Sequence, residues 1–456
     1  MKVRVEGTGG PQGWPVPGCA CASCGRLDPG HRRPASVLVD DRVRLAPAEP
    51  GQAPETATAT APDTPMAPEA PAAPNTATAP GAPITSDAPA GPHAGAEGRL
   101  PEGYRELRTS DGCEITTRDG GRLLYAVGPP SGRGEPDPPL DAPFDVVLID
   151  LPDRPERLGD LRRRGRVTPR TRIVAVHLCH RIPSEGELAR RLGFWGAETV
   201  PDGAVVDTAS TPITGGPAHV TGVRHTANAP SPTTTGSAGA AGDQTRAGDP
   251  ATGSPAPDVT VTNGVRAAQR GGRPRRTLLL GGSRSGKSEE AELRLAAEPE
   301  VTYVATGPSG GDDPDWLARV RAHRDRRPAH WRTLETTDLV AVLSGGRGTF
   351  LVDGIGTWLA AVFDECGAWP DDARPEDLRR LALGRVEARC AALVDAWRGT
   401  RARVVAVSDE TGLGVIPATA AGRLFRDALG RLNQALARES EEVALVVAGR
   451  IVPLPI

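Results

Sequence analysis

Short apolar runs recur along the C-terminal part of the chain, with helical patterns between them. The runs have strand length and are apolar at nearly every position, as expected for strands buried on both faces of a parallel sheet. They lie at Thr277–Leu280, Val301–Val304, Phe350–Val352, Val404–Val407 and Val443–Val447. The intervening helical patterns include Ser288–Ala297, Leu378–Trp397 and Ala420–Ala437. Strands that alternate with helices predict an α/β domain with a mostly parallel sheet and flanking helices.

Two long stretches carry no apolar periodicity. Residues 47–98 consist mostly of Ala, Pro, Thr and Gly, and residues 227–272 share this bias with Ser and Asp added. Such segments cannot bury a core and are predicted to be flexible. We therefore predict an N-terminal domain at 1–226 that carries the first stretch as an insertion. A disordered linker at 227–272 and a C-terminal domain at 273–456 follow.

Composition supports this division and excludes some classes of protein. The 456 residues include 55 Gly and 46 Pro but only 3% aromatics, so part of the length is linker. A net charge of −3 gives no general attraction to nucleic acid or to a membrane surface. The N-terminus lacks the apolar core of a signal peptide, and no run of about 18 apolar residues could span a membrane. We expect a cytoplasmic protein.

The sharpest chemical signal is a glycine-rich loop between the first C-terminal strand and the helix after it. It matches the phosphate-binding pattern G-x-x-x-x-G-K-S and comprises Gly281, Gly282, Ser283, Arg284, Ser285, Gly286, Lys287 and Ser288. Its backbone N–H groups and the helix N-terminus would hold nucleotide phosphates. Lys287, one of two lysines in the chain, would neutralise the terminal phosphates, and the Ser288 hydroxyl would bind Mg²⁺. A chance glycine turn is the weaker alternative, because pattern and context agree.

Acids at the ends of other strands would complete a magnesium site. Asp353 follows the run Phe350–Val352 and is the predicted Mg²⁺ ligand; a simple cap of the next helix is the alternative. Asp409 and Glu410 form a second acidic pair after a strand, at the edge where open α/β sheets bind ligands.

An arginine-rich segment holds a candidate nucleophile. His323 is one of two histidines in the C-terminal domain, and Arg324, Asp325, Arg326 and Arg327 follow it. Arginines can clamp a triphosphate, and a neutral imidazole can attack phosphorus to give a phosphoramidate. From the residues alone, a solvated basic face is an equal alternative.

In order along the chain, these motifs resemble those of the bifunctional adenosylcobinamide kinase / adenosylcobinamide-phosphate guanylyltransferase family of cobalamin biosynthesis. The matching segments are GGSRSGKS at 281–288, VATG at 304–307, HRDRRPAHWRTLE at 323–335, LVDG at 351–354, VSDETGLGVIP at 407–417, and the stretch from 423 to 434. The resemblance covers essentially all of residues 276–456. Generic P-loop kinases share only the first motif.

The resemblance implies two reactions. The enzyme would phosphorylate the aminopropanol hydroxyl of adenosylcobinamide with GTP or ATP. It would then transfer GMP from GTP to adenosylcobinamide phosphate through a guanylylated histidine, His323, and release pyrophosphate. The implied nucleotide contacts are the phosphate loop, Ala305, Thr306, Gly307, Arg324, Asp325, Arg326, Arg327, Glu335 and Asp353. Asp409 departs from the family pattern, which often has Asn there. Because many members are trimers, a homo-oligomer is expected.

The N-terminal domain offers a second candidate site. Cys19, Cys21 and Cys24 are spaced C-x-C-x-x-C, which favours metal ligation over disulfides. The opening residues and the segments 144–150 and 176–180 resemble metallo-β-lactamase-fold hydrolases of the phosphodiesterase type. The resembling subgroup has a structural Zn²⁺ site, which implies Cys19, Cys21, Cys24 and His180 as ligands; buried free thiols are the alternative. The catalytic H-x-H-x-D-H cluster is missing from the sequence, so we predict a degenerate, non-catalytic domain.

Two other functions remain open. One is a small-molecule kinase that uses the phosphate loop without guanylyltransferase activity. The other is a binding or scaffold protein that is stabilised by a structural metal and has a vestigial nucleotide site. Labelling of His323 by GTP would separate the bifunctional enzyme from the plain kinase. GTP turnover that requires Lys287 would exclude the scaffold.

Overall fold

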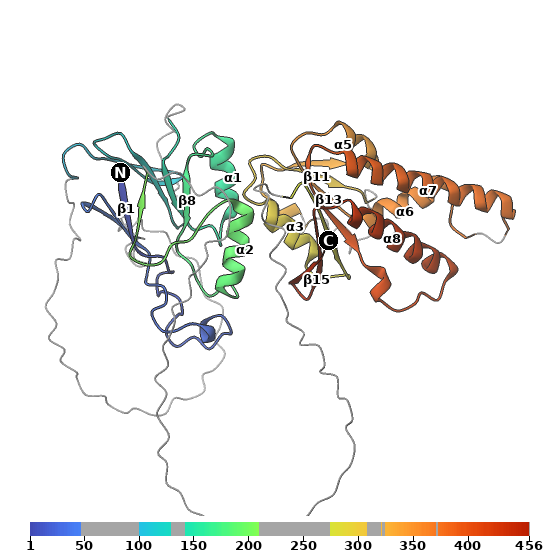
Figure 1. The fold of residues 1–456 in the computed structure, drawn as a ribbon, viewed down its shortest axis with the longest axis horizontal. Helices are drawn as coiled ribbons and strands as arrows, with labels where there is room; N and C mark the ends of the chain where they lie inside the picture. The colour runs from blue at the N-terminus through green and yellow to red at the C-terminus, as the bar shows by residue number, and fades with distance from the viewer. Residues whose placement is uncertain are drawn as a thin grey trace, which may run out of the picture. The chain divides into compact units, whose positions relative to one another are not determined.

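The computed structural model describes residues 1–46, 100–128, 142–208, 274–307, 321, 324–370 and 373–455. The chain forms two compact units, Met1–Thr211 and Pro212–Ile456, which Figure 1 shows as ribbons. The predicted insertion at 47–98, the predicted linker at 227–272 and the candidate nucleophile His323 lie outside the described residues. Within the described part, no helix is both long enough and apolar enough to cross a membrane.

The C-terminal unit is built on a seven-stranded sheet in the order β12-β11-β13-β14-β10-β15-β16. All neighbouring strands pair in parallel except β15 and β16, which confirms the predicted mostly parallel sheet. The predicted apolar runs correspond to β10, β11, β13, β14 and β15. The edge strands β12 and β16 are largely exposed and carry no such run. The strands are β10 (Arg276–Gly281), β11 (Thr302–Ala305), β12 (Arg332–Glu335), β13 (Thr349–Asp353), β14 (Arg403–Asp409), β15 (Glu442–Val447) and β16 (Arg450–Leu454).

Helices cover both faces of this sheet (Figure 1). Leu278 and Leu280 of β10 pack in one core with residues of four helices, whereas Leu279 packs in another with Ala291 and Leu295 of α3. Burial on both faces explains why the central strands are continuously apolar. The helices are α3 (Lys287–Leu295) on one face, and α5 (Leu339–Gly345), α6 (Ile355–Cys366), α7 (Glu376–Gly399) and α8 (Ala420–Arg438) on the other.

The N-terminal unit contains two sheets that share a core, in which residues such as Val3, Val37, Leu123 and Leu148 are completely buried. One sheet is antiparallel, with the order β3-β2-β1-β9. Its strands are β1 (Lys2–Gly7), β2 (Ser36–Val39), β3 (Val43–Leu45) and β9 (Ala204–Asp207).

The second sheet of this unit is mixed, with the order β4-β5-β6-β7-β8, and only its last three strands pair in parallel. Among the residues described for this unit, α1 follows β7 and α2 follows β8 along the chain. The elements are β4 (Arg105–Thr109), β5 (Gly112–Thr116), β6 (Arg122–Ala126), β7 (Val146–Ile149), α1 (Pro155–Arg163), β8 (Arg172–Ala175) and α2 (Glu185–Trp195). The metallo-β-lactamase resemblance of this unit stays a prediction.

Candidate functional site

Parallel pairing brings the carboxyl ends of several strands to one edge of the C-terminal sheet. Ala305 at the end of β11 pairs with both Glu335 of β12 and Asp353 of β13. Asp409 at the end of β14 pairs with Gly281, where the phosphate loop begins. The structure therefore gathers the phosphate loop and three acids along the edge where open α/β sheets bind ligands.

The phosphate loop turns tightly from β10 into α3. Gly286 caps α3 in the left-handed conformation, with φ of 95°. Glycine is required at position 281 as well, because a Cβ there would lie 2.5 Å from Ser285 Oγ and 2.7 Å from the Val446 carbonyl oxygen. Residues 282–284 are exposed. The backbone of the loop and the N-terminus of α3 are thus open to a phosphate group.

Lys287 is held by two oxygen atoms at this edge. Its Nζ donates to the Gly282 carbonyl oxygen at 3.0 Å and forms an ion pair with Asp409 Oδ1 at 2.9 Å. The pairing with Asp409 was not anticipated from the sequence, because Lys287 begins α3 whereas Asp409 ends β14, far along the chain. Phosphate oxygens would compete with Asp409 for the same ammonium group, since both are negatively charged.

Ser288 and Asp353 lie close enough to share a cation. The Ser288 hydroxyl donates to Asp353 Oδ1 at 3.1 Å. Two oxygens on one octahedral Mg²⁺, each at about 2.1 Å, are separated by about 3.0 Å, so the pair fits this ion without rearrangement. The N-cap residue of α6 is Gly354, directly after Asp353.

Tyr303 of β11 is a site residue that the motifs did not reveal. Its hydroxyl donates to Asp353 Oδ2. Burial, followed by the charge of Asp353, raises the Tyr303 pKa far above its usual value, so the phenol stays protonated and keeps donating. The Arg327 guanidinium lies over its ring, 3.7 Å from the centroid. The only signal in the sequence was its rarity, because the chain has three tyrosines.

Thr306 holds the turn that follows β13. Its side chain is buried, and its hydroxyl donates to the Gly354 carbonyl oxygen at 2.6 Å and lies 2.7 Å from the Thr357 hydroxyl. Ala305 and Gly307 on either side are half-buried at the end of β11. This segment therefore supports the backbone next to Asp353.

The arginine segment approaches the same edge. Arg327 reaches Tyr303, and Arg326 Nε pairs with Glu292 of α3 at 3.2 Å. Arg324 and Asp325 are exposed. Two of the three predicted arginines thus contact α3, which follows the phosphate loop, and β11, which pairs with the strand that ends at Asp353.

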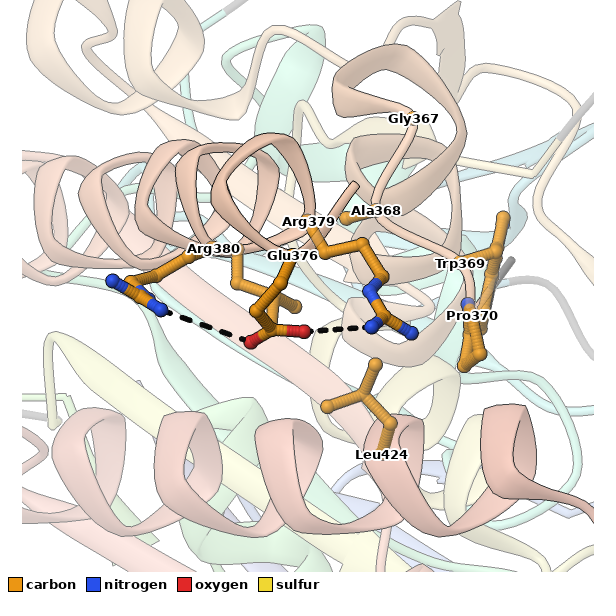
Figure 2. A pocket seen from close by; sticks show the side chains of 9 residues that line it. Gly367, Ala368, Trp369, Pro370, Glu376, Arg379, Arg380 and Leu424 are labelled. Carbon is orange, nitrogen blue, oxygen red and sulfur yellow. Dashed lines mark ion pairs between the residues drawn. The ribbon is translucent and has the colours of Figure 1, made fainter. Parts of the chain in front are cut away.

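A separate hollow lies at the far end of α6 (Figure 2). There Glu376 pairs with Arg379 at 2.7 Å and with Arg380 at 4.0 Å. Because α6 begins just after Asp353 and has 12 residues, this hollow lies about 18 Å from the nucleotide edge. Its lining contains no predicted site residue and comprises Gly367, Ala368, Trp369, Pro370, Glu376, Arg379, Arg380, Leu383 and Leu424.

The predicted zinc ligands come together in the N-terminal unit. His180 Nδ1 lies 3.2, 3.8 and 3.6 Å from the Sγ atoms of Cys19, Cys21 and Cys24. All four ligand atoms lie within 4.8 Å of one another. A tetrahedral Zn²⁺ with about 2.3 Å to sulfur and about 2.1 Å to nitrogen separates its ligand atoms by roughly 3.5–3.8 Å. The cluster therefore has the composition and the spacing of a structural zinc site.

Asp150, directly after β7, does not belong to this metal cluster and pairs with an arginine instead. Asp150 is buried, and its carboxylate pairs with Arg157 at 3.0 Å and accepts from the Gly128 N–H at 3.1 Å. Burial raises the Asp150 pKa despite the nearby arginine. Asp150 thus makes a buried ion pair that joins β7 to α1.

Comparisons with known proteins match the C-terminal part. Residues 277–454 match a family described as cobinamide kinase / cobinamide phosphate guanyltransferase. The chain is 37% identical over 177 residues to the bifunctional adenosylcobalamin biosynthesis protein CobU of Salmonella typhimurium, covering 95% of that protein and 38% of this chain. It is 40% identical over 186 residues to the bifunctional adenosylcobalamin biosynthesis protein CobP of Pseudomonas aeruginosa, covering 96% of it and 39% of this chain. It is 34% identical over 177 residues to CobU of Escherichia coli, covering 95% of that protein.

Proposed function

Because the chain belongs to the cobinamide kinase / cobinamide phosphate guanyltransferase family, we propose that its C-terminal unit carries out both reactions. It phosphorylates adenosylcobinamide with GTP or ATP and then transfers GMP from GTP to the product. One observation carries the proposal. The phosphate loop, Lys287 and the Ser288–Asp353 pair lie on one sheet edge, in a chain that matches nearly the whole length of bifunctional relatives.

The kinase step uses the phosphate loop. The nucleotide phosphates lie on the loop backbone and the N-terminus of α3, and Lys287 exchanges Asp409 for the terminal phosphates. Ser288 and Asp353 would hold Mg²⁺, which would supply positive charge to offset that of the phosphates. The substrate hydroxyl oxygen attacks the γ-phosphorus, and the bond to the bridging oxygen breaks to release the nucleoside diphosphate.

The guanylyltransferase step uses His323. Its imidazole attacks the α-phosphorus of GTP, and pyrophosphate leaves. The phosphate of adenosylcobinamide phosphate then attacks the resulting phosphoramidate and frees the histidine. The arginines after His323 support this assignment, since Arg326 and Arg327 are held against α3 and β11 beside the magnesium acid. Their charges would stabilise the developing negative charge on phosphorus oxygens.

The test uses GTP labelled at the α-phosphate, with Mg²⁺, and scores label retained on the denatured chain. We expect label that is acid-labile and base-stable on the wild type and none on His323→Ala. His330→Ala is the matched control, because His330 is the other histidine of residues 273–456 and its Nε2 lies 3.4 Å from the Glu298 carbonyl oxygen. It should keep the label. A wild type that binds GTP without labelling would favour the plain kinase.

The N-terminal cluster is proposed to hold one structural Zn²⁺. The proposal is supported by the convergence of three thiols and one imidazole from segments far apart in the chain. Such an ion would join the cysteine loop to the segment after β8. A homo-oligomer, a trimer as in many relatives, and a cytoplasmic location stay predictions from the resemblance.

A further inference from the structure

The segment that follows β14 begins at the phosphate end of the nucleotide site. β14 lies between β10, which leads into the phosphate loop, and β13, which ends at Asp353. The Glu410 N–H donates to the Gly281 carbonyl oxygen at 3.1 Å, and the preceding Asp409 pairs with Lys287. Because the lysine of such a loop contacts the terminal phosphates, the segment starts where an acceptor must approach the γ-phosphate.

This segment presents apolar side chains to solvent. Leu413 is 72% exposed, Val415 is 94% exposed and Ile416 is 67% exposed. They are the three most exposed large apolar side chains of the described residues, and they lie within four positions of one another. Single exposed apolar residues are ordinary, but a group of them beside polar chemistry indicates a surface that binds an apolar body.

The backbone of the segment is anchored at both ends by α8. Arg426 donates to the Gly412 carbonyl oxygen at 3.0 Å. Arg423 donates to the carbonyl oxygens of Pro417 at 3.0 Å and Ala418 at 2.6 Å. The apolar side chains are therefore carried on a segment whose ends are held in place, which lowers the entropy lost when they contact a ligand.

Glu410 is oriented by a buried polar network. Asn433 of α8 is 3% exposed, and its Nδ2 donates to Glu410 Oε2 at 3.4 Å and to the Asp409 carbonyl oxygen at 3.0 Å. The Asn433 Oδ1 accepts from the buried Ser408 hydroxyl at 2.7 Å. A satisfied buried network of this kind fixes the position of the carboxylate that it holds.

We propose that residues 410–417 form the subsite for the acceptor of the kinase step. Leu413, Val415 and Ile416 pack against the apolar surface of the corrinoid macrocycle, and Glu410 accepts a hydrogen bond from its aminopropanol hydroxyl. As the hydroxyl oxygen attacks the γ-phosphorus, Glu410 takes its proton and the nucleoside diphosphate leaves. The assignment rests on the proposed function, because it states where the substrate of that function binds.

The first experiment measures adenosylcobinamide binding directly by equilibrium dialysis of the full chain. The combined variant Leu413→Ser, Val415→Ser, Ile416→Ser should raise the dissociation constant for adenosylcobinamide by at least about tenfold, because it removes the apolar contacts. Labelling of the chain by GTP, which needs no acceptor, should be unchanged. Leu381→Ser is the matched control, since Leu381 is 60% exposed but belongs to α7. It should bind the corrinoid as the wild type does.

Three results would overturn the assignment or its basis. Unchanged corrinoid affinity in the triple variant, with a wild type that phosphorylates adenosylcobinamide, would show that the subsite is elsewhere. A fall in molar mass of the triple variant by light scattering would show that the segment joins copies of this chain instead. A wild type that binds nucleotide but never phosphorylates adenosylcobinamide would refute the proposed function itself.

A second variant separates the carboxylate from the apolar contacts. Glu410→Gln should lower kcat of the kinase step by about 100-fold, as expected on loss of a general base. Its labelling by GTP, which needs no acceptor, should match the wild type. An unchanged kcat would remove Glu410 from the mechanism.

Discussion

At the scale of single residues, Asp353 is positioned through both of its oxygens. Oδ1 accepts from Ser288 at 3.1 Å, and Oδ2 accepts from the Tyr303 phenol. With Oδ2 occupied, the carboxylate is held so that Oδ1 faces the Ser288 hydroxyl. The ring of Tyr303 also supports Arg327. One side chain thus connects the arginine segment to the proposed magnesium site.

Replacing this tyrosine tests whether the orientation of Asp353 matters for metal binding. Tyr303→Phe keeps the ring beneath Arg327 but removes the donor to Asp353. We expect the Mg²⁺ concentration for half-maximal kinase activity to rise by about tenfold, a change worth about 1.4 kcal/mol and typical of a hydrogen bond to a charged group. The measurement is a Mg²⁺ titration of initial rates.

The matched control for that titration is Tyr125→Phe in the N-terminal unit. The Tyr125 hydroxyl is buried without a hydrogen-bond partner, so its removal should leave the Mg²⁺ dependence unchanged. If Tyr303→Phe lowers thermal stability but leaves the Mg²⁺ titration unaltered, the phenol has only a structural role.

At the scale of elements, the cysteine loop and the segment after β8 are joined at one point. Cys19, Cys21 and Cys24 lie around the short 3₁₀ helix η1 (Cys24–Arg26), and His180 follows β8. A zinc ion there would act as a cross-link between these segments, because ligands that are far apart in the chain must converge before it binds.

Metal analysis tests this cross-link. The purified chain should contain about one Zn²⁺, and Cys21→Ser should lose most of it and unfold at a lower temperature in the N-terminal unit. Cys390→Ser in α7 is the control, because Cys390 lies in the other unit and should leave the zinc content unchanged. If the wild type contains no zinc and Cys21→Ser does not change its stability, the cysteines are free thiols and not metal ligands.

The start of α2 carries a pH-dependent contact. Glu185 accepts two hydrogen bonds from the buried Arg32, at 2.6 and 2.7 Å. Partial burial works to raise the Glu185 pKa, but the hydrogen bonds and charge of Arg32, followed by those of His31, outweigh it and hold the pKa below its usual value. A carboxyl with a lowered pKa stabilises the fold above its unfolded pKa of about 4.3, and this contribution is lost as pH falls further.

Acid unfolding therefore offers a direct measurement. Glu185→Gln should destabilise the N-terminal unit near neutral pH, because it leaves the buried Arg32 without its charge partner. The stability gap between wild type and variant should shrink as pH is lowered from 5 towards about 3. A gap that stays constant over this range would show that the ion pair does not set the acid stability.

At the scale of the whole molecule, the two units are built as separate structures. The C-terminal unit has its own core on both faces of its sheet. Two relatives align with this chain over 95% and 96% of their own length, and the aligned part is less than half of this chain. Every residue assigned to the two reactions lies in that unit. The N-terminal unit has a distinct core and the metal cluster.

Separate expression tests this independence. A fragment comprising residues 274–456 should fold and show both reactions with kcat within about threefold of the full chain, because relatives of this length are complete proteins. The same fragment with Lys287→Ala is the negative control. A folded fragment that lacks activity would show that the N-terminal unit contributes to the site.

Local signals in the sequence predicted the elements well where burial imposes a pattern. The strands β10 and β14 are apolar through their centres because both faces of the sheet are covered, and their boundaries were predicted within two residues. The edge strands β12 and β16 were missed, since exposed strands need no apolar pattern. α6 was also missed, because most of its residues are apolar, and a short apolar run can be either a buried strand or a helix.

The sequence by itself determined the chemistry that resides in one contiguous segment. A phosphate loop works through its own backbone and the next helix, so its eight residues carry the whole signal. Only the tertiary structure decided which distant side chains meet. The pairs Lys287–Asp409 and Tyr303–Asp353 depend on which strands are neighbours and in what register. The Asn433–Glu410 contact depends on how α8 packs on the sheet. Strand order and helix packing arise from the combined burial of many residues, so no local pattern encodes these contacts.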